Sequence, residues 1–163
     1  MFERTRAIAT DVDGVLTDGT FWWGTNGEEF KRFCFADLTG VAMARKAGLH
    51  LALISGESSE AARVLVQRFA DKLQITDVYA GCHDKAAAVS EFAAMHLLQL
   101  SEVCFIGDDL LDVPAMEIVG IGVAPANAQK AARAKAGWIA SRDGGCGVLR
   151  EVVEKIIEEQ NLA

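Results

Sequence analysis

The sequence lacks an excess of positive charge and any long apolar run. It has 16 Lys and Arg residues against 23 Asp and Glu, a formal net charge of −7, whereas nucleic acids and anionic membranes are bound through basic patches. No run of about 20 apolar residues could span a bilayer, and no segment has the basic start and apolar stretch of a signal peptide. We therefore expect no nucleic-acid partner, no membrane association and a cytoplasmic protein.

The sequence also lacks a pair of closely spaced cysteines. Cys34, Cys82, Cys104 and Cys146 lie far apart, so that a zinc ribbon or a thioredoxin-like motif has no support, and we expect buried, reduced thiols. Internal repeats, low-complexity tracts and linkers are absent as well. The 163 residues have the size of one ordinary globular domain, and we expect a single domain over residues 1–163.

Short apolar runs alternate with stretches of helical period along most of the chain. The runs "RAIATD", "HLALIS" and "EVCFIGD", for example, are each followed by a longer segment of helical period. This alternation is typical of an α/β domain with a mainly parallel, Rossmann-like sheet, and strands that are apolar throughout fit burial on both faces. Gly48 and Gly137 stand where helices are expected to end.

One segment, residues 20–35, interrupts this alternation. Its sequence "TFWWGTNGEEFKRFCF" places aromatic and β-branched residues on both sides of an Asn-Gly turn signal, which predicts a β-hairpin. An exposed ribbon does not tolerate so much apolar surface; the aromatic residues are Trp22, Trp23, Phe30, Phe33 and Phe35. We expect the hairpin to pack against another subunit. The alternative is that it folds back onto its own domain.

Acidic residues gather where the first strand is expected to end. The stretch "TDVDGVLTDG", residues 10–19, places Asp11 and Asp13 two positions apart, just after the apolar residues 7–9. Two unit charges about 4 Å apart repel each other by roughly 4 kcal/mol at an effective dielectric constant near 20. A cation must therefore lie nearby.

Polar or small residues also follow three further predicted strands. Ser55, Gly56 and Glu57 stand at the end of the strand predicted from "HLALIS". Lys85 begins a helix after the strand predicted from "DVYA", and the strand in "EVCFIGD" is followed by Asp108, Asp109 and Asp112. In an open α/β sheet, ligands bind beyond the carboxyl ends of the strands. We therefore expect all these residues to converge with Asp11 and Asp13 on one edge of the sheet.

The charges of this set fit a metal ion together with a phosphate. Asp11 and Asp108 suit a hard divalent cation with oxygen ligands, most simply Mg²⁺. Two carboxylates and a phosphate dianion carry about −4, against about +3 from magnesium and Lys85 together, which leaves a mildly negative site. Lys85 is thus expected near the phosphate, with hydrogen bonds from Ser55 and the backbone of Gly56.

The spacing of Asp11 and Asp13 predicts two catalytic roles. Asp11 can attack phosphorus through its carboxylate and form an aspartyl-phosphate, which splits one hard hydrolysis into two easier steps. Asp13 would protonate the leaving sugar oxygen in the first step and activate water in the second.

These residues closely resemble the motifs of the haloacid dehalogenase superfamily of aspartate-nucleophile phosphatases. The matching segments are Asp11-Val12-Asp13-Gly14, Ser55, Lys85 and Gly107-Asp108-Asp109-Leu110-Leu111-Asp112. The dehalogenases themselves lack the second aspartate, so that Asp13 favours phosphate chemistry. The resemblance implies that magnesium is bound by the side chains of Asp11 and Asp108 and by the main-chain carbonyl of Asp13, with Asp109 and Asp112 supporting them.

A narrower resemblance is to the capless phosphatases of 3-deoxy-2-ulosonic acid phosphates, which act on 3-deoxy-manno-octulosonate 8-phosphate or 2-keto-3-deoxy-nononate 9-phosphate. It rests on "DVDGVLTDG", the aromatic hairpin, "GDDLLDVPAMEIVGIGVAPANA" and "GGCGVLRE". The segment between Asp11 and Ser55 has room for a hairpin and a helix but not for a folded cap domain. The resemblance further implies a homotetramer, in which a hairpin and a C-terminal segment of neighbouring subunits roof the site.

Two departures from the octulosonate pattern bear on the substrate. The octulosonate enzymes carry an arginine where this chain has Glu57, and Asp-Gly where it has Asp37-Leu38, which leaves the local loop shape open. Glu57 together with Arg68 is more similar to the nononate phosphatases. We expect Glu57 to bind substrate hydroxyls or to pair with an arginine; the alternative is a solvated acid that the helix dipole favours.

The C-terminal tail, residues 144–163, offers one more candidate. By resemblance, its "GGCG" segment would enter a neighbour's site, with Arg150 available for a substrate carboxylate. The alternative is an ordinary amphipathic helix in which Arg150 pairs with Glu154.

The sequence thus predicts a Mg²⁺-dependent phosphatase of a sugar-acid phosphate. One alternative is a phosphatase of different or broader substrate range. Another is a catalytically silent tetramerisation scaffold, although a scaffold has no physical need to gather these charges. None of the three histidines has a partner spacing that indicates a ligand, and we expect structural or solvent roles for His50, His83 and His96.

Overall fold

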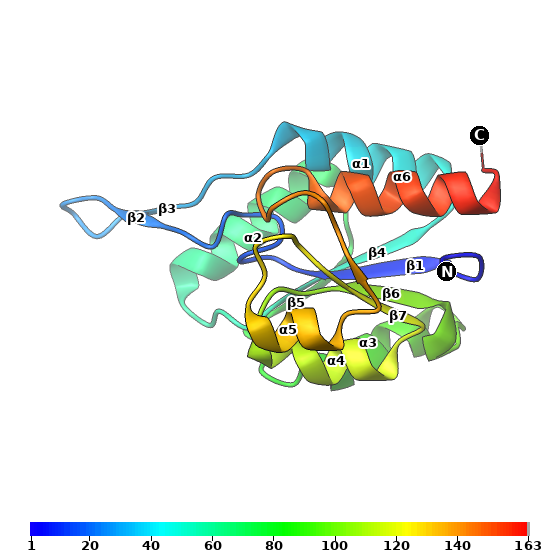
Figure 1. The fold of residues 1–163 in the computed structure, drawn as a ribbon. Helices are drawn as coiled ribbons and strands as arrows, with labels where there is room; N and C mark the ends of the chain where they lie inside the picture. Colours follow the sequence, from blue (N-terminus) through cyan, green and yellow to red (C-terminus); the bar gives the residue numbers. More distant parts are fainter. Residues whose placement is uncertain (163) are drawn as a thin grey trace.

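A computed structural model of the chain describes residues 1–162, which form a parallel sheet with helices on both faces (Figure 1). The six strands have the order β5-β4-β1-β6-β7-β8, and every neighbouring pair is parallel. Their bounds are β1 Ala7–Asp11, β4 His50–Ser55, β5 Asp77–Ala80, β6 Val103–Ile106, β7 Ile121–Ala124 and β8 Trp138–Ile139. The predicted α/β, Rossmann-like parallel sheet is confirmed.

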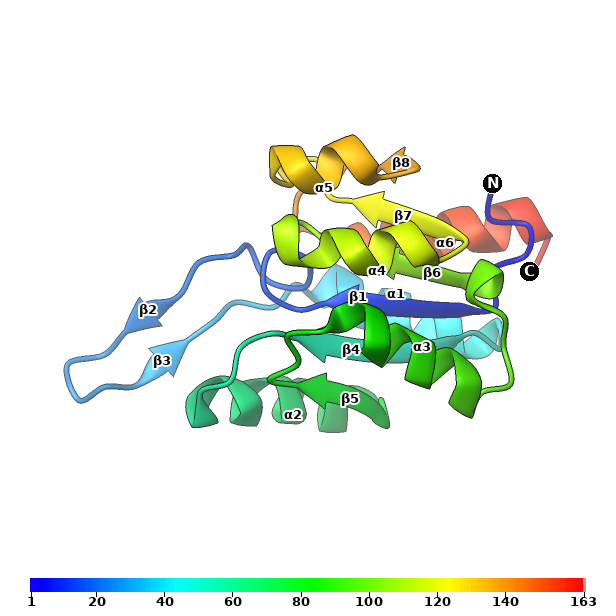
Figure 2. The same ribbon diagram turned by 90° about the horizontal axis from the view of Figure 1, so that it is seen from below.

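Helices cover the two faces of the sheet in groups of three. The first group is α1 (Phe35–Lys46), α2 (Glu60–Leu73) and α6 (Val148–Gln160), and the second is α3 (Lys85–Met95), α4 (Val113–Ile118) and α5 (Lys130–Lys135) (Figures 1 and 2). Two short 3₁₀ turns, Leu100–Glu102 and Leu110–Asp112, flank β6. Within residues 1–162, none of the helices is long and apolar enough to cross a membrane.

The central strand β1 is buried along its whole length because both of its faces are covered. Ile8 points into the cluster of apolar side chains beneath α1, α2 and α6, whereas Ala7 and Ala9 point into the cluster beneath α3, α4 and α5. From β1 the chain runs to β4 and β5 on one side, and then to β6, β7 and β8 on the other. The strand order therefore reverses next to β1, and ligands bind at such a switch point.

Between β1 and β4 the described chain holds a hairpin and α1, and no cap domain. The hairpin pairs β2 (Trp22–Trp23) with β3 (Glu29–Phe30) as antiparallel strands, and it projects beyond the carboxyl ends of the sheet strands (Figures 1 and 2). Trp22 and Trp23 are 56% and 73% exposed. The hairpin prediction is confirmed, and its paired strands leave their aromatic side chains uncovered by this chain.

The end of the predicted hairpin segment is different in the structure. Phe35 begins α1, because the aromatic composition that suggested a strand continues into the first turn of the helix. Phe33 stacks on Phe69 of α2 with a ring-centroid distance of 4.3 Å. The segment that follows β3 thus packs on its own domain through Phe33, whereas the paired strands do not.

The expectation of buried thiols is correct for Cys104 alone. All four cysteines are free, Cys34 and Cys82 are partly buried, and Cys146 is exposed. The exposure of Cys146 follows from its place in the glycine-rich loop that precedes α6. That loop packs against the chain after β1, where the backbone N–H of Gly145 donates a hydrogen bond to the carbonyl of Val15 at 2.8 Å.

Candidate functional site

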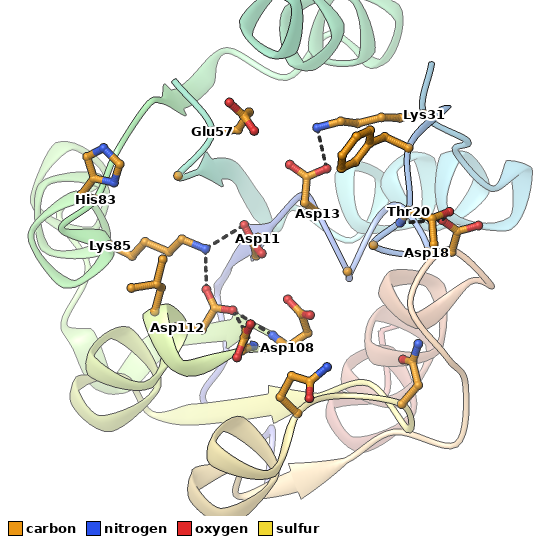
Figure 3. A pocket seen from close by; sticks show the side chains of 18 of the residues that line it. Asp11, Asp13, Asp18, Thr20, Lys31, Glu57, His83, Lys85, Asp108 and Asp112 are labelled. Atoms are coloured by element: carbon orange, nitrogen blue, oxygen red, sulfur yellow. Dashed lines mark hydrogen bonds and ion pairs between the residues drawn. The ribbon is translucent and has the colours of Figure 1, made fainter. Parts of the chain in front are cut away.

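A cavity of about 650 Å³ lies at the carboxyl ends of the sheet strands, between the base of the hairpin and the loops after β4, β5 and β6 (Figure 3). Acidic side chains dominate its lining: Asp11, Asp13, Asp18, Glu57, Asp108, Asp109 and Asp112. The lysine and arginine side chains that line it within residues 1–162 are Lys31 and Lys85. The cavity therefore carries the concentration of carboxylates that the sequence predicts.

Local sequence signals place the central residues of the site. Asp11 is the last residue of β1. The side chain of Asp84 caps α3 by accepting a hydrogen bond from the backbone N–H of Ala87 at 2.9 Å, so that Lys85 occupies the first helical position. Gly14 has a φ of +94°, and a Cβ atom there would collide with the carboxylate of Asp108. Glycine is therefore required where the loop after β1 passes the loop after β6.

Lys85 joins two aspartates from different loops. Its Nζ lies 2.8 Å from Oδ1 of Asp11 and 2.6 Å from Oδ1 of Asp112, and all three side chains are at most 7% exposed (Figure 3). The other oxygen of Asp112 accepts hydrogen bonds from the backbone N–H groups of Asp108 and Asp109 at 2.9 and 3.0 Å. Asp112 thus fixes both the ammonium group and the loop that carries Asp108.

The carboxylates of Asp11 and Asp108 lie in surroundings that disfavour their charged forms. Burial raises the pKa of Asp11 well above its ordinary range, although the charge of Lys85 opposes the shift. Burial, together with the nearby carboxylate of Asp112, raises the pKa of Asp108 to about 6. A cation between Asp11 and Asp108 would reverse this effect, because an opposite charge favours ionised carboxylates.

The donor set fits a divalent cation of the magnesium type. Carboxylate oxygens of Asp11, Asp108 and Asp112 lie within 4.8 Å of one another, and oxygen ligands are those that Mg²⁺ prefers. Both oxygens of Asp112 already serve Lys85 and backbone N–H groups. Asp11 gives one of its oxygens to Lys85. Its other oxygen and the carboxylate of Asp108 are the groups that could hold such an ion.

Asp13 has a cation of its own, which the sequence analysis missed. Nζ of Lys31 lies 2.9 Å from Oδ1 of Asp13 (Figure 3). The same Nζ lies 3.5 Å from Oε1 of Glu29. Burial alone would lower the pKa of Lys31, but the hydrogen bond and charge of Asp13 raise it above its ordinary value. Lys31 therefore stays cationic and holds the second aspartate of the motif.

The loop after β4 also borders the cavity. Gly56 and Glu57 line the cavity, whereas Ser55 is fully buried, and its Oγ accepts a hydrogen bond from the backbone N–H of Glu57 at 3.3 Å. The carboxylate of Glu57 accepts from the backbone N–H of Ser59 at 3.0 Å, and this bond lowers the pKa of Glu57. Glu57 is thus an ionised side chain at the rim.

Known proteins resemble this chain over most of its length. A family of haloacid dehalogenase-like hydrolases matches residues 41–152 of the chain. The 3-deoxy-D-manno-octulosonate 8-phosphate phosphatase of Escherichia coli is 35% identical over 158 residues, which are 97% of this chain and 82% of the relative. The enzyme of the same name from Yersinia pestis is 36% identical over 156 residues, 96% of this chain and 81% of the relative.

The chain belongs to the haloacid dehalogenase-like hydrolases.

Solved structures place this hydrolase within one branch of the family. The 3-deoxy-D-manno-octulosonate 8-phosphate phosphatase of Moraxella catarrhalis, in complex with a magnesium ion, a phosphate ion and a KDO molecule, superimposes with a TM-score of 0.92 at 34% identity, covering 98% of this chain and 90% of that one. The cobalt-bound Haemophilus influenzae phosphatase gives 0.90 at 31% identity, covering 98% and 91%. This hydrolase is accordingly a phosphatase, a phosphoric monoester hydrolase.

Two predicted specificity residues of this hydrolase lie outside its own cavity. Arg68 is an exposed residue of α2 and lines an apolar groove with Phe33, Phe35 and Phe69. Arg150 lies in α6, where its Nε is 2.8 Å from Oε1 of Glu154. The pairing of Arg150 with Glu154, stated above as the alternative to a substrate contact, is thus present within the chain.

Further residues line the cavity of the hydrolase although sequence reasoning did not select them. They come from the hairpin base, the loop after β5 and the segment after β7, and they include Asp18, Phe21, Lys31, His83, Asn127 and Gln129. A signal existed for Lys31 alone, because the repulsion between Asp11 and Asp13 called for nearby cations. The others reach the cavity through loop courses that no local pattern indicates.

Proposed function

We propose that this phosphatase hydrolyses a phosphorylated 3-deoxy-2-ulosonic acid, either octulosonate 8-phosphate or nononate 9-phosphate, through an aspartyl-phosphate intermediate on Asp11. The observation that carries the proposal is the cluster of Asp11, Asp13, Lys85 and Asp108 in one open cavity. Relatives that match nearly all of this chain and are named as octulosonate 8-phosphate phosphatases support the substrate class. The chain length of the sugar acid is the part that the relatives leave open.

Mg²⁺ is the cofactor of the proposed reaction. Its ligands would be the carboxylates of Asp11 and Asp108 and the main-chain carbonyl of Asp13, with Asp109 and Asp112 in supporting positions. When bound, the ion neutralises phosphoryl charge as the transition state forms. The raised pKa values of Asp11 and Asp108 support this assignment, because burial disfavours both charged carboxylates and a bound cation would compensate that burial.

The chain's own residues perform the covalent steps. Asp11 attacks phosphorus through a carboxylate oxygen, and the bond between phosphorus and the sugar oxygen breaks. Asp13 donates a proton to that leaving oxygen, which would otherwise depart as a strongly basic alkoxide. In the second step Asp13 accepts a proton from water, the water oxygen attacks phosphorus, and Asp11 is released as a carboxylate.

Lys85, Ser55 and Gly56 form the proposed phosphate-binding set. Lys85 holds Asp11 in place at 2.8 Å and brings a positive charge to the floor of the cavity. The backbone of Gly56 faces the cavity. Oγ of Ser55 accepts a hydrogen bond from the backbone N–H of Glu57, which leaves its O–H proton to donate to a phosphate oxygen.

The substrate carboxylate poses a separate problem in so acidic a cavity. Lys31 and Lys85 already pair with aspartates. No arginine lines the cavity within residues 1–162, although an arginine would suit a substrate carboxylate. We place Glu57 at the sugar hydroxyls, and Arg68 and Arg150 of neighbouring subunits at the carboxylate. This arrangement requires an oligomer, for which we propose a homotetramer, and the exposed indoles of Trp22 and Trp23 support association.

The first experiment ranks substrates by kcat/KM for phosphate release with Mg²⁺. The panel holds octulosonate 8-phosphate, nononate 9-phosphate, N-acetylneuraminate 9-phosphate and hexose phosphates. We expect one ulosonic acid phosphate to exceed the hexose phosphates by at least about tenfold, a difference of about 1.4 kcal/mol in transition-state binding. Preference for a nine-carbon acid would assign Glu57 and Arg68 to specificity.

The Asp11→Asn variant is the control for that panel, because an amide cannot form the acyl-phosphate. We expect it to fold and to release no phosphate from any substrate. Turnover of all sugar phosphates at similar rates would favour the broader phosphatase. No turnover by the wild-type protein would favour the silent scaffold and overturn the proposal.

A further inference from the structure

Lys31 is buried at a place where its charge has a specific use. Its side chain is 6% exposed, and burying an ammonium group is costly unless a carboxylate compensates it. Asp13 provides that compensation at 2.9 Å. The other lysine of the cavity, Lys85, is engaged by Asp11 and Asp112, so that Lys31 is the cation paired with Asp13 within the described residues.

The position of Lys31 is itself fixed by the hairpin. Lys31 directly follows β3, and Glu29 of that strand lies 3.5 Å from its Nζ. The other oxygen of Glu29 accepts a hydrogen bond from Nε1 of Trp23 at 3.3 Å. Trp23 and Glu29 are cross-strand partners in the hairpin. A series of polar contacts therefore runs from the exposed indole of Trp23 to the carboxylate of Asp13. Its middle step, between Glu29 and Lys31, is an ion pair in which Oε1 of Glu29 makes no hydrogen bond within residues 1–162.

Asp13 would be poorly held without this series. Its carboxylate is a third exposed, it follows Asp11 by two residues, and it shares the cavity with six other acidic side chains. Repulsion from these carboxylates would turn an untethered Asp13 toward solvent. A general acid must lie within hydrogen-bond reach of the oxygen that it protonates.

We propose that Lys31 is a positioning residue, which the hairpin residue Glu29 holds in place and which keeps the Asp13 carboxylate directed into the cavity. This inference rests on the proposed phosphatase function. It adds that the hairpin determines the geometry of proton transfer from within the same chain. A displacement of β3 would move Lys31, and with it Asp13.

The test replaces Lys31 by Met, which keeps an unbranched side chain one atom shorter and removes its charge. Three substrates are compared: the preferred ulosonic acid phosphate, a hexose 6-phosphate without a carboxylate, and 4-nitrophenyl phosphate. The first two leave as alkoxides that need a proton, whereas 4-nitrophenolate leaves without one. The ratio kcat/KM reports the first chemical step, in which the leaving group departs.

We expect Lys31→Met to lower kcat/KM at least about tenfold for both sugar phosphates, because general acid catalysis contributes roughly 10²- to 10⁴-fold. The loss for 4-nitrophenyl phosphate should stay below about threefold. Lys31→Arg should recover most of the sugar phosphate activity, since the guanidinium can also pair with Asp13. Lys46→Met, a charge-matched change at an exposed position of α1, is the control and should leave all three rates unchanged.

Other patterns of activity across the three substrates would overturn the proposal. Equal loss for all three substrates would mean that Lys31 binds phosphate or supports the fold, and loss for the ulosonic acid alone would mean that it binds the substrate carboxylate. Unchanged rates would show that Asp13 needs no tether. If Lys31→Met fails to fold, Glu29→Gln provides the same comparison, with a smaller loss of the same pattern expected.

A crystal structure of Lys31→Met gives an answer that does not depend on activity. We expect the Asp13 carboxylate to leave the orientation that it has in the wild-type crystal, with the backbone of residues 11–17 unchanged. An Asp13 side chain in its original place would contradict the inference. A wild-type protein inactive on every substrate would overturn the proposed function, whereas this structural comparison would still decide the role of Lys31.

Discussion

Single carboxylates in this protein take their properties from the few charges that surround them. Asp11 and Asp13 have the same chemical group and stand two positions apart, yet Asp11 is buried against Lys85 while Asp13 is partly exposed against Lys31. The sequence allowed the need for cations to be predicted from repulsion alone. It did not identify Lys31, because that residue reaches Asp13 only through the course of the hairpin.

A prediction for the metal follows from Asp11 and Asp108. Mg²⁺ that binds the folded chain alone raises the free energy of unfolding, by about 2.7 kcal/mol at a concentration of 100 times its Kd. We expect Mg²⁺ to raise the melting temperature of the wild-type protein and EDTA to reverse the rise. Asp108→Asn should lose the Mg²⁺-dependent shift, whereas Asp71→Asn on the exposed side of α2 should keep it. An equal shift in both variants would place the ion elsewhere.

Asp37 gives a pH-dependent prediction away from the cavity. Its carboxylate is fully buried, Oδ1 accepts a hydrogen bond from the backbone N–H of Arg150 at 3.2 Å, and Oδ2 has no partner within residues 1–162. Burial raises its pKa to about 6, against the hydrogen bonds from the start of α6. The folded state therefore holds this proton more tightly than the unfolded state, whose carboxyl titrates near 4.

The sign of the effect follows by linkage. The stabilising contribution of protonated Asp37 is complete below about pH 4 and is lost as the pH rises through about 6, a change of up to about 3 kcal/mol. Asp37→Asn cannot titrate, so that its stability relative to the wild-type protein should increase between pH 4.5 and pH 7. Urea unfolding of both proteins measures this difference, in which the shared groups cancel. A constant difference would contradict the assignment.

Secondary-structure elements were largely predictable from the sequence, because most of them are either wholly buried or strongly periodic. The strands β4 and β5 begin and end at the residues expected from "HLALIS" and "DVYA". The start of α1 was not predicted, since the aromatic residues of the hairpin continue to Phe35. What separates Phe33 from the exposed strands is its long-range contact with Phe69, which local sequence does not encode.

The loop before α6 gives a prediction for an element contact. A Cβ atom on Gly144 would collide with the carbonyl of Gly14, and the backbone N–H of Gly144 donates to Oδ1 of Asn127 at 2.9 Å. We expect Gly144→Ala to lower the free energy of unfolding by about 1–3 kcal/mol, typical of overpacking, and to reduce phosphatase activity by shifting the loop that carries Asp13.

Gly137→Ala is the matched control for that variant. A Cβ atom at Gly137 would meet Ile121 at an ordinary distance of 3.4 Å, and the change should alter stability by no more than about 0.5 kcal/mol. Equal effects at Gly144 and Gly137 in chemical denaturation would show that the loop can move away from Gly14 without cost.

The assembly of several chains is the feature of the whole molecule that the sequence alone predicted least well. The hairpin was recognisable from its turn and its aromatic residues, but its partner surface depends on how several chains fit together. Trp22, Trp23 and Phe30 remain more than half exposed in the single chain. An apolar ribbon of this kind is typical of a surface that becomes buried on association.

The proposed homotetramer is the species that we expect in solution. Light scattering after size-exclusion chromatography should give about four times the chain mass of 17.5 kDa. Trp22→Ser combined with Trp23→Ser should release smaller species, because it removes the aromatic area that association would bury. Ile139→Ser alters an exposed apolar residue outside the hairpin and should leave the mass of the assembly unaltered. A monomeric wild-type protein would refute the proposed closure of the site by neighbours.

The two ends of the described chain meet at the pole of the sheet farthest from the hairpin (Figure 1). The amino group of Met1 lies 2.8 Å from Oε2 of Glu159, and Nε2 of Gln160 donates to the carbonyl of Thr5 at 2.8 Å. A surface anchor or a fluorescent fusion joined to either end would thus face away from the opening of the catalytic cavity. Immobilised through that pole, the enzyme would present its cavity to the flowing substrate, a practical orientation for a biosensor.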